Sequence, residues 1–140
     1  MSEHAITKLK RLEGYRFKAE FDVEGIPDLI VDELEPIGEN TGPNPTRLLS
    51  TAVGHCLSSS LLFCLSKAHV EVKNLETQVT AFTKRNEQGR LRIEQLQVQL
   101  HIEVAEEDKP RLPRCLSLFE DYCTVTQSVR QGIEVTVDVK

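Results

Sequence analysis

Hydrophobic and polar residues alternate in several stretches of the chain, and this alternation predicts β-strands. Residues 15–23 place aromatic and aliphatic side chains on one face and charged side chains on the other, which is typical of a half-buried strand. A turn with Gly and Pro follows, so residues 29–31 should return antiparallel to this strand. The same period predicts a hairpin of residues 75–84 and 91–104, and a last strand over residues 133–139.

A long apolar helix is predicted between these strands. Asn44 is a good N-cap and Pro45 suits the first helical position, and no further proline or clustered glycine occurs until about Ala68. Apolar residues lie on nearly all sides of this helix, which is typical of a buried one. At 1.5 Å per residue it should run ~35 Å and form the central element of the fold.

Shorter helices are predicted near the C-terminus. Glu106 opens an acidic segment that suits a helix N-terminus, and Cys115 and Cys123 then share one inward stripe. A further short helix should stop at Gly132. Tight turns between neighbouring strands favour antiparallel sheets, so the predicted fold class is α+β. A chain of 140 residues suits a single domain over residues 1–140.

Charge and hydropathy exclude some partners. Seventeen basic residues stand against 22 acidic ones, for a net charge of −5, whereas a nucleic-acid-binding protein needs a basic surface to neutralise phosphates. The short cluster of Lys8, Lys10 and Arg11 fits the polar side of an edge strand better. The N-terminus lacks the apolar stretch of a signal peptide, and no apolar run approaches the ~20 residues of a membrane span. We therefore expect a cytoplasmic protein with no nucleic-acid or membrane partner.

Four cysteines are the residues best able to carry chemistry. In a reducing cytoplasm we expect thiols, ligands or catalysts rather than structural disulfides. Cys56 lies midway along the long helix among small residues that let a ligand come close. Cys123 precedes a predicted helix whose N-terminus can lower its pKa. Buried packing is the usual role of a free cysteine, and Cys64 and Cys115 are interpreted in that way.

Other reaction classes find little support. No C-x-x-C or H-x-x-x-H pair occurs, and the neighbours His55 and Cys56 point about 100° apart on a helix, so no metal site is predicted. His55 is either a core or interface histidine or a base near Cys56. The serines at 58–60 lie in a helix without the sharp turn that exposes a hydrolase nucleophile.

Two motifs resemble those of the OsmC/Ohr superfamily of peroxide-defence proteins. Gly42-Pro43-Asn44-Pro45 is followed, eleven residues after Pro45, by Cys56, which is similar to the first motif of the family and its spacing. The segment that begins at Cys123 resembles the second motif, Cys-Pro-Val-Ser, with its short helix and valine-rich strand. The order of the predicted elements also agrees, so the resemblance covers nearly the whole chain.

The resemblance implies an OsmC-like fold, with antiparallel sheets wrapped around the long buried helix. It also implies an intertwined homodimer with two active sites at the subunit interface. In the peroxidases of the family, the cysteine that matches Cys56 attacks an organic hydroperoxide, or hydrogen peroxide, and becomes a sulfenic acid. The cysteine that matches Cys123 then condenses with it to a disulfide. No bound cofactor is implied, and an external dithiol protein of the lipoyl or thioredoxin type restores the pair.

This chain departs from the family at the group that activates the thiol. Members of the Ohr type carry Glu where this chain has Thr46, and that Glu holds an arginine against the thiolate. Arg47 lies nine residues before Cys56 and roughly opposite on the helix, so it should not serve its own Cys56. The candidate cation is Arg16, or an arginine of a partner subunit. Thr124 replaces the Pro of the second motif, which is a mild change at a helix start.

Three functions remain open from the sequence. The leading hypothesis is a peroxidase with Cys56 as nucleophile and Cys123 as resolving thiol, with Thr46, Arg47 and His55 as candidates for the groups around the site. The missing Glu favours instead a non-catalytic, dimeric binding protein for a small apolar ligand. A general disulfide reductase is the weakest of the three, since the cysteines do not form a C-x-x-C motif.

Overall fold

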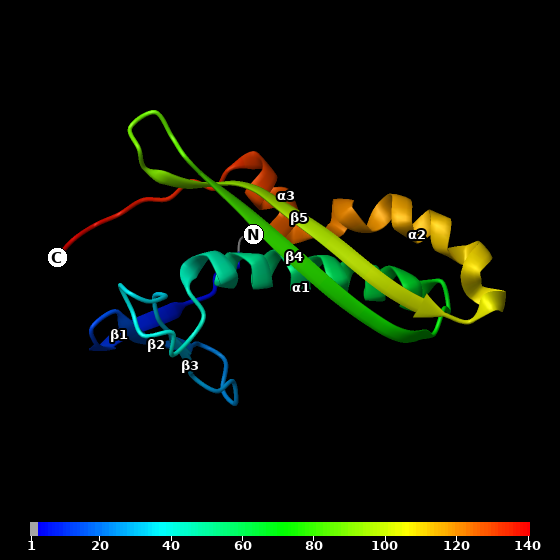
Figure 1. Ribbon diagram of the computed structural model, residues 1–140. Coiled ribbons are helices and arrows are strands. Elements are labelled where there is room, and N and C mark those ends of the chain that lie inside the picture. The colour runs from blue at the N-terminus through cyan, green and yellow to red at the C-terminus, as the bar shows by residue number, and fades with distance from the viewer. Residues whose placement is uncertain (1–2) are drawn as a thin grey trace. The chain divides into compact units, whose positions relative to one another are not determined.

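The computed structural model describes residues 3–140, and residue contacts divide the chain into two compact units with a boundary between Leu49 and Ser50. The N-terminal unit holds an antiparallel sheet whose strands follow one another in the order β1 (Thr7–Glu13), β2 (Arg16–Phe21) and β3 (Leu29–Val31) (Figure 1). The predicted strand and its antiparallel return are therefore confirmed. The single domain stays a prediction.

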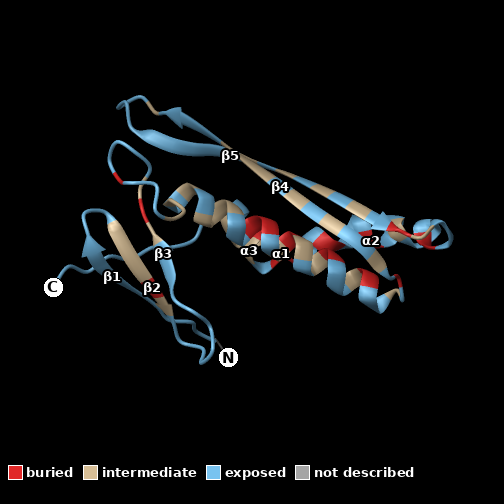
Figure 2. Ribbon diagram, turned by 60° about the horizontal axis from the view of Figure 1, so that its bottom comes forward, coloured by how far each residue is buried: buried red, intermediate tan, exposed pale blue. Residues whose placement is uncertain are grey.

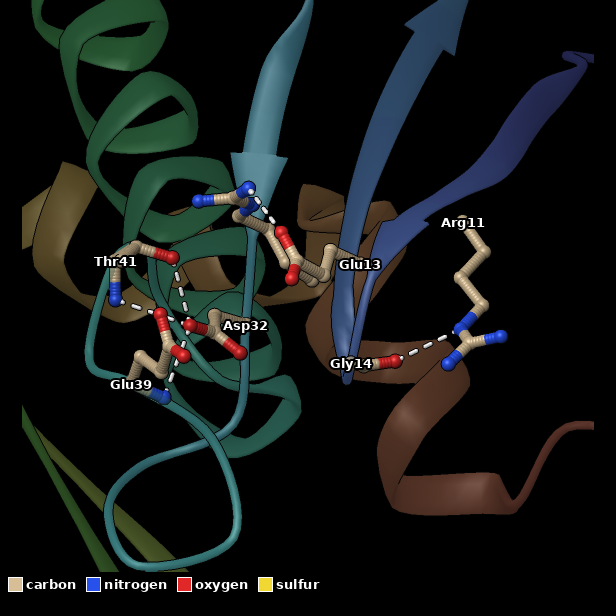
Figure 3. A network of polar contacts seen from close by, with 7 residues as sticks. Arg11, Glu13, Gly14, Asp32, Glu39 and Thr41 are labelled. Carbon is tan, nitrogen blue, oxygen red and sulfur yellow. Dashed lines mark hydrogen bonds and ion pairs between the residues drawn. The ribbon is translucent and has the colours of Figure 1, made fainter.

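Asp32 organises the loop that follows β3 (Figure 3). Its buried carboxylate accepts hydrogen bonds from the backbone N–H groups of Glu33, Glu39 and Thr41, and from the Thr41 hydroxyl at 2.6 Å. These bonds, and first the one from the Thr41 hydroxyl, lower the pKa of Asp32 to about 2, because each favours the charged form. The carboxylate is therefore ionised at neutral pH and holds the loop that leads into the long helix.

The long helix, α1 (Pro45–Lys67), begins where the sequence predicts. The Asn44 side chain accepts a hydrogen bond from the Arg47 backbone N–H at 3.2 Å, which is the expected N-cap interaction. By length and composition alone, helix α1 is long and apolar enough to cross a membrane. The expectation that no apolar run approaches this length was therefore wrong. A core helix of a globular protein meets the same criterion, and one stripe of α1 is packed into the C-terminal unit.

The remaining elements belong to the C-terminal unit. The predicted hairpin is confirmed as β4 (Val72–Arg85) and β5 (Leu91–Val104), which pair antiparallel along their whole length. Four short helices follow, and they are η1 (Glu106–Arg111), α2 (Leu112–Leu118), η2 (Phe119–Tyr122) and α3 (Thr124–Gln131). Gly132 ends α3 with a φ of 76°, as the sequence predicts. The chain thus has the α+β class of fold.

One stripe of α1 forms the core of the C-terminal unit (Figure 2). Leu57, Leu61 and Leu65 are at most 5% exposed, and they recur every four residues on one face of the helix. The residues that pack with this stripe come from the hairpin and the short helices, and they include Val104, Cys115, Phe119 and Cys123. On α1 itself, Leu62 and Phe63 stay 42% and 66% exposed. The helix is therefore buried along one stripe and not all round, because the elements of this unit cover only that side.

The predicted last strand over residues 133–139 does not form. The segment after α3 has no secondary structure, and Val135, Val137 and Val139 are 77%, 82% and 90% exposed. A strand needs a neighbour that accepts and donates its backbone hydrogen bonds, and no strand of the described chain pairs with this segment. The alternating pattern is present, but its pairing partner is not within the described residues.

Small residues bring α1 close to β4. A Cβ atom on Gly54 would lie 2.7 Å from Val79 Cγ2, so any larger residue would require the Val79 side chain to shift. One turn later, the Ser58 hydroxyl lies 2.6 Å from the Thr77 hydroxyl and 2.7 Å from the Gly54 carbonyl. This close approach fixes how α1 lies on the hairpin, and so where Cys56 lies between these two positions.

Replacing Gly54 with Ala should destabilise the protein. The added methyl overpacks against Val79, at a typical cost of ~1–3 kcal/mol, while the better helix propensity of Ala recovers at most ~1 kcal/mol. Urea unfolding should therefore show a net loss of up to ~2 kcal/mol for Gly54→Ala when the helix propensity recovers its full share. The control is the same Gly54→Ala change in a protein that already carries Val79→Ala. There the contact is relieved, so the change should alter the free energy of unfolding little or increase it. An equal loss in both backgrounds would show that the Gly54–Val79 contact is not the cause.

Candidate functional site

Cys56 and Cys123 meet in the C-terminal unit. Cys56 lies in the middle of α1 and is half-buried, whereas Cys123 is fully buried at the N-cap position of α3. Both are free thiols, and their side chains are hydrogen-bonded to each other. The sequence placed the two cysteines on separate helices, and the packing of those helices brings the sulfur atoms together.

The first turn of α3 surrounds the two sulfur atoms with hydrogen-bond donors. Cys123 Sγ accepts the Thr126 backbone N–H at 3.4 Å and lies 3.0 Å from the Thr126 hydroxyl oxygen. The backbone N–H groups of Thr124 and Val125 point at Cys56 Sγ. Unpaired N–H groups at a helix N-terminus favour negative charge. The pair therefore occupies a place that stabilises one thiolate.

The two thiols differ in acidity. Burial tends to raise the pKa of Cys123, but hydrogen bonds from Cys56 and Thr126 outweigh it and hold this pKa below its ordinary value. The pKa of Cys56 is raised, first by burial and then by its hydrogen bond to Cys123. When the pair loses its first proton, the negative charge is therefore favoured on Cys123 and the remaining proton on Cys56, because the hydrogen bonds from Cys56 and Thr126 favour the Cys123 thiolate.

A cavity of about 1250 Å³ opens beside Cys56. Phe63, Ala68 and Leu118 contribute apolar walls, and Thr124 brings the start of α3 to the same cavity. Cys56 is thus the member of the pair that a small molecule in the cavity can reach. Cys123 does not line the cavity and is 0% exposed.

Cys64 and Cys115 form a disulfide between α1 and α2, and both line the same cavity. The interpretation of these residues as plain core thiols was therefore wrong, as was the expectation of no structural disulfide. Their Cα atoms lie 5.7 Å apart although they are separated by 51 residues in sequence, which is an ordinary Cα separation for a disulfide. No local spacing signals this contact, because it depends on how α2 packs against α1.

The other candidates from the sequence are placed as follows. Arg16 belongs to the N-terminal unit, where its guanidinium lies 3.9 Å from the Glu13 carboxylate. Arg47 lies in the first turn of α1 and donates to the Asn44 side chain, and Thr46 is half-buried beside it. His55 is exposed on α1 next to Cys56.

Among residues 3–140, no group of three or more His, Cys, Asp or Glu side chains is arranged to hold a metal ion. The arrangement beside the cavity is instead that of a dithiol. One thiol is reachable, the other is acidic and buried, and the two touch. Such a pair can pass between the dithiol and disulfide states.

The fold and the paired thiols place this chain among small α+β thiol proteins. Its sequence matches the family of OsmC-like proteins over residues 38–138, and the chain belongs to that family. The expected resemblance is thereby confirmed.

Solved structures agree on the fold. An OsmC-like protein from Mycoplasma pneumoniae is 13% identical with a TM-score of 0.75, and the match covers 93% of this chain and 89% of that one. An OsmC-like protein of unknown function from Vibrio cholerae is 18% identical with a TM-score of 0.70, covering 91% and 94%. An organic hydroperoxide resistance protein from Elizabethkingia anophelis is 17% identical with a TM-score of 0.67, covering 96% and 93%. A search of curated proteins finds no match.

The Thr126 hydroxyl should help to keep Cys123 ionised. In Thr126→Val the backbone N–H remains and the hydroxyl is lost, so the pKa of Cys123 should rise and less thiolate should be present at neutral pH. The measurement is a titration of thiolate absorbance in the ultraviolet, to which the disulfide of Cys64 and Cys115 does not contribute. Thr124→Val is the matched control, because it loses a hydroxyl with no recorded bond to sulfur. Identical titration midpoints for both variants and wild type would contradict the assigned role.

Proposed function

We propose that this protein is a thiol-dependent peroxidase that reduces organic hydroperoxides through Cys56 and Cys123. The observation that carries the proposal is the contact between a reachable thiol on a cavity wall and a buried, acidic thiol at a helix N-terminus. The family includes proteins that are named for resistance to organic hydroperoxides. The apolar walls of the cavity favour an organic hydroperoxide over hydrogen peroxide, since they offer contacts to its carbon skeleton.

In the proposed first step, the Cys123 thiolate takes the proton of Cys56. The Cys56 thiolate then attacks the terminal oxygen of the hydroperoxide, and the O–O bond breaks. The departing alkoxide takes the proton from Cys123 and leaves as the alcohol. Cys56 becomes a sulfenic acid, and Cys123 is again a thiolate.

In the second step, the Cys123 thiolate attacks the Cys56 sulfur. The sulfenic oxygen leaves as hydroxide, which takes a proton from solvent, and a disulfide joins the two cysteines. A dithiol reductant then restores both thiols by two exchange reactions. No bound cofactor is needed for these steps, and we propose a reductant protein of the lipoyl or thioredoxin type. We also propose that the protein is located in the cytoplasm, where such reductant proteins are found.

The rate of the first step depends on how readily Cys56 loses its proton. A cation near Cys56 would favour the thiolate. Arg16 is the proposed cation, as the sequence suggests, and an arginine of a second copy is the alternative. The Arg16 Nε atom is buried without a hydrogen bond, so this N–H remains available as a donor.

We further propose that the protein is a homodimer. The valines of residues 133–139 alternate along an exposed, unpaired segment, and the edge strand β1 exposes Leu9 and Leu12 at 57% and 48%. Exposed apolar residues on unpaired backbone are typical of a surface that a second chain covers. The last strand predicted by the sequence would then form against the second copy.

The peroxidase proposal is tested by hydroperoxide consumption with excess dithiol. Wild type should consume cumene hydroperoxide faster than hydrogen peroxide. Cys56→Ser should fall to the rate of free dithiol without protein, because the nucleophile is gone. Cys123→Ser should slow the first turnover, because the proposed base is gone, and it should leave a sulfenic acid on Cys56 that is no longer resolved within the protein.

Wild-type turnover no faster than free dithiol would overturn the peroxidase. The apolar cavity would then favour the second candidate, a non-catalytic binding protein for a small apolar ligand.

The homodimer is tested by light scattering on a dilution series. Val135→Asp with Val137→Asp should shift the protein toward monomer, because the variant places two charges on the face that the partner should bury. Glu134→Gln with Asp138→Asn alters the opposite face of the same segment and should leave the dimer intact. A wild-type protein that is monomeric at all concentrations would rule out the homodimer.

A further inference from the structure

The disulfide between Cys64 and Cys115 takes no part in the proposed peroxidase reaction. Its two sulfur atoms belong to α1 and α2, and both residues line the cavity beside Cys56. A disulfide that only tied two helices together could lie anywhere in the core. This one is presented to the same cavity that gives access to the reachable thiol.

The two ends of this disulfide differ in exposure. Cys64 is half-buried, whereas Cys115 is 2% exposed. Thiol–disulfide exchange begins with attack of a thiolate on one sulfur along the S–S axis, and the other sulfur leaves. A thiolate in the cavity can therefore attack Cys64, and Cys115 is the leaving group.

The charged residues that line the cavity beside this disulfide are all cationic. Lys67, Arg111 and Arg114 line the cavity, and no acidic residue does. Lys67 follows Cys64 by three residues on α1, so the two lie on neighbouring positions of one helix face. Arg111 is the last residue of η1 and directly precedes α2, which holds Cys115. The cations are thus placed around the disulfide.

These cations are only partly neutralised. Asp108 pairs with Arg111, which also donates to the Ala68 carbonyl at 3.3 Å. The Lys67 ammonium lies 5.3 Å from the centre of the Phe63 ring, an interaction that leaves its charge in place. Within the described residues, Arg114 has no recorded ion pair. A net positive charge therefore remains in the cavity.

A positive cavity selects among thiols by charge. Cations on the walls of a cleft raise the local concentration of anions. They also favour the thiolate that leaves from Cys115. A thiol that carries a second negative charge, such as a carboxylate or sulfonate, gains from the first effect, and a cationic thiol loses.

We propose that Cys64–Cys115 is a thiol–disulfide exchange site for small anionic thiols, separate from the Cys56–Cys123 pair. A thiolate RS⁻ attacks Cys64 Sγ, the S–S bond breaks, and Cys115 leaves as a thiolate that takes a proton from solvent. A second RS⁻ attacks the R sulfur of the mixed disulfide and releases the Cys64 thiolate and RSSR. Two thiols are oxidised and one protein disulfide is reduced. The reverse reaction with RSSR restores the disulfide, so the site equilibrates with the thiol pool.

The test compares three thiols that share the skeleton HS–CH₂–CH₂–X. These are mercaptoethanesulfonate, mercaptoethanol and cysteamine, which carry an anionic, neutral and cationic group. The oxidised protein with Cys56→Ser and Cys123→Ser is used, so that the only reactive disulfide is Cys64–Cys115. Loss of the disulfide is followed by alkylation and mass spectrometry. Each reduction rate is expressed per thiolate and divided by the rate of the same thiol with the urea-unfolded protein. If the protein with Cys56→Ser and Cys123→Ser does not fold, peptide mapping of the wild type gives the same readout for Cys64 and Cys115.

The anionic thiol should react about tenfold faster than the cationic one on this scale, and added salt should shrink the difference. Arg114→Gln and Lys67→Gln should each reduce the preference. Lys73→Gln removes an exposed cation of β4 that does not line the cavity, and it should leave the preference unchanged. Equal normalised rates for the three thiols, or a disulfide that is reduced only after unfolding, would overturn the proposal.

A trapping experiment identifies the attacked sulfur. With Cys115→Ser, Cys64 should form a stable mixed disulfide with oxidised mercaptoethanesulfonate, because no second cysteine displaces it. With Cys64→Ser, the buried Cys115 should react much more slowly. Faster labelling of Cys115 than of Cys64 would contradict the assigned direction of attack. Neither readout uses a hydroperoxide, so the result does not depend on the proposed peroxidase activity.

Discussion

Burial of one stripe of α1 is the interaction on which the C-terminal unit depends. Leu57, Leu61 and Leu65 lose nearly all contact with water, and each such burial typically contributes ~1.5–3 kcal/mol. The hairpin and the short helices supply the surfaces that cover this stripe. Each sulfur pair has one member on α1 and the other on or beside a C-terminal helix, at Cys115 or Cys123. Both pairs therefore exist only because those helices pack on α1, and a change in that packing would separate both.

The sequence predicted the elements more completely than their contacts. The Asn44 cap, the hairpin and the helix start after Cys123 are local signals, and residues near one another in the chain determine them. The disulfide of Cys64 depends on a residue 51 positions away, and a single sequence contains no local sign of it. For segment 133–139 the error is the reverse, because the sequence predicts a strand that does not form. Its alternation is a genuine strand pattern, but a strand also needs a neighbouring edge, which the pattern does not specify.

The location of the negative charge could not be predicted from the sequence for a related reason. Sequence reasoning required a cation beside Cys56, because a thiol in the middle of a helix gains little from its own helix dipole. Donors come instead from the first turn of α3, where Thr126 lowers the pKa of Cys123 and the backbone N–H groups of Thr124 and Val125 offset part of the rise in the pKa of Cys56. Access and acidity are thus divided between two sulfur atoms. A buried thiol with a lowered pKa is protected from solvent reagents and, once ionised, can take the proton of its reachable neighbour, so the division suits the proposed nucleophile and resolving roles.

The two sulfur pairs are close in the fold but chemically separate. Cys56 and Cys64 are eight residues apart on α1, which corresponds to ~12 Å along the helix axis, too far for direct exchange between their sulfur atoms. Backbone N–H groups surround the first pair, whereas cationic side chains surround the second. The cavity is the feature that they share. A thiol that enters to reduce a disulfide at Cys56 occupies the same cavity as Lys67, Arg111 and Arg114, so its charge affects access to both pairs. Charge selection is therefore expected to be a property of the shared cavity and not of either sulfur pair alone.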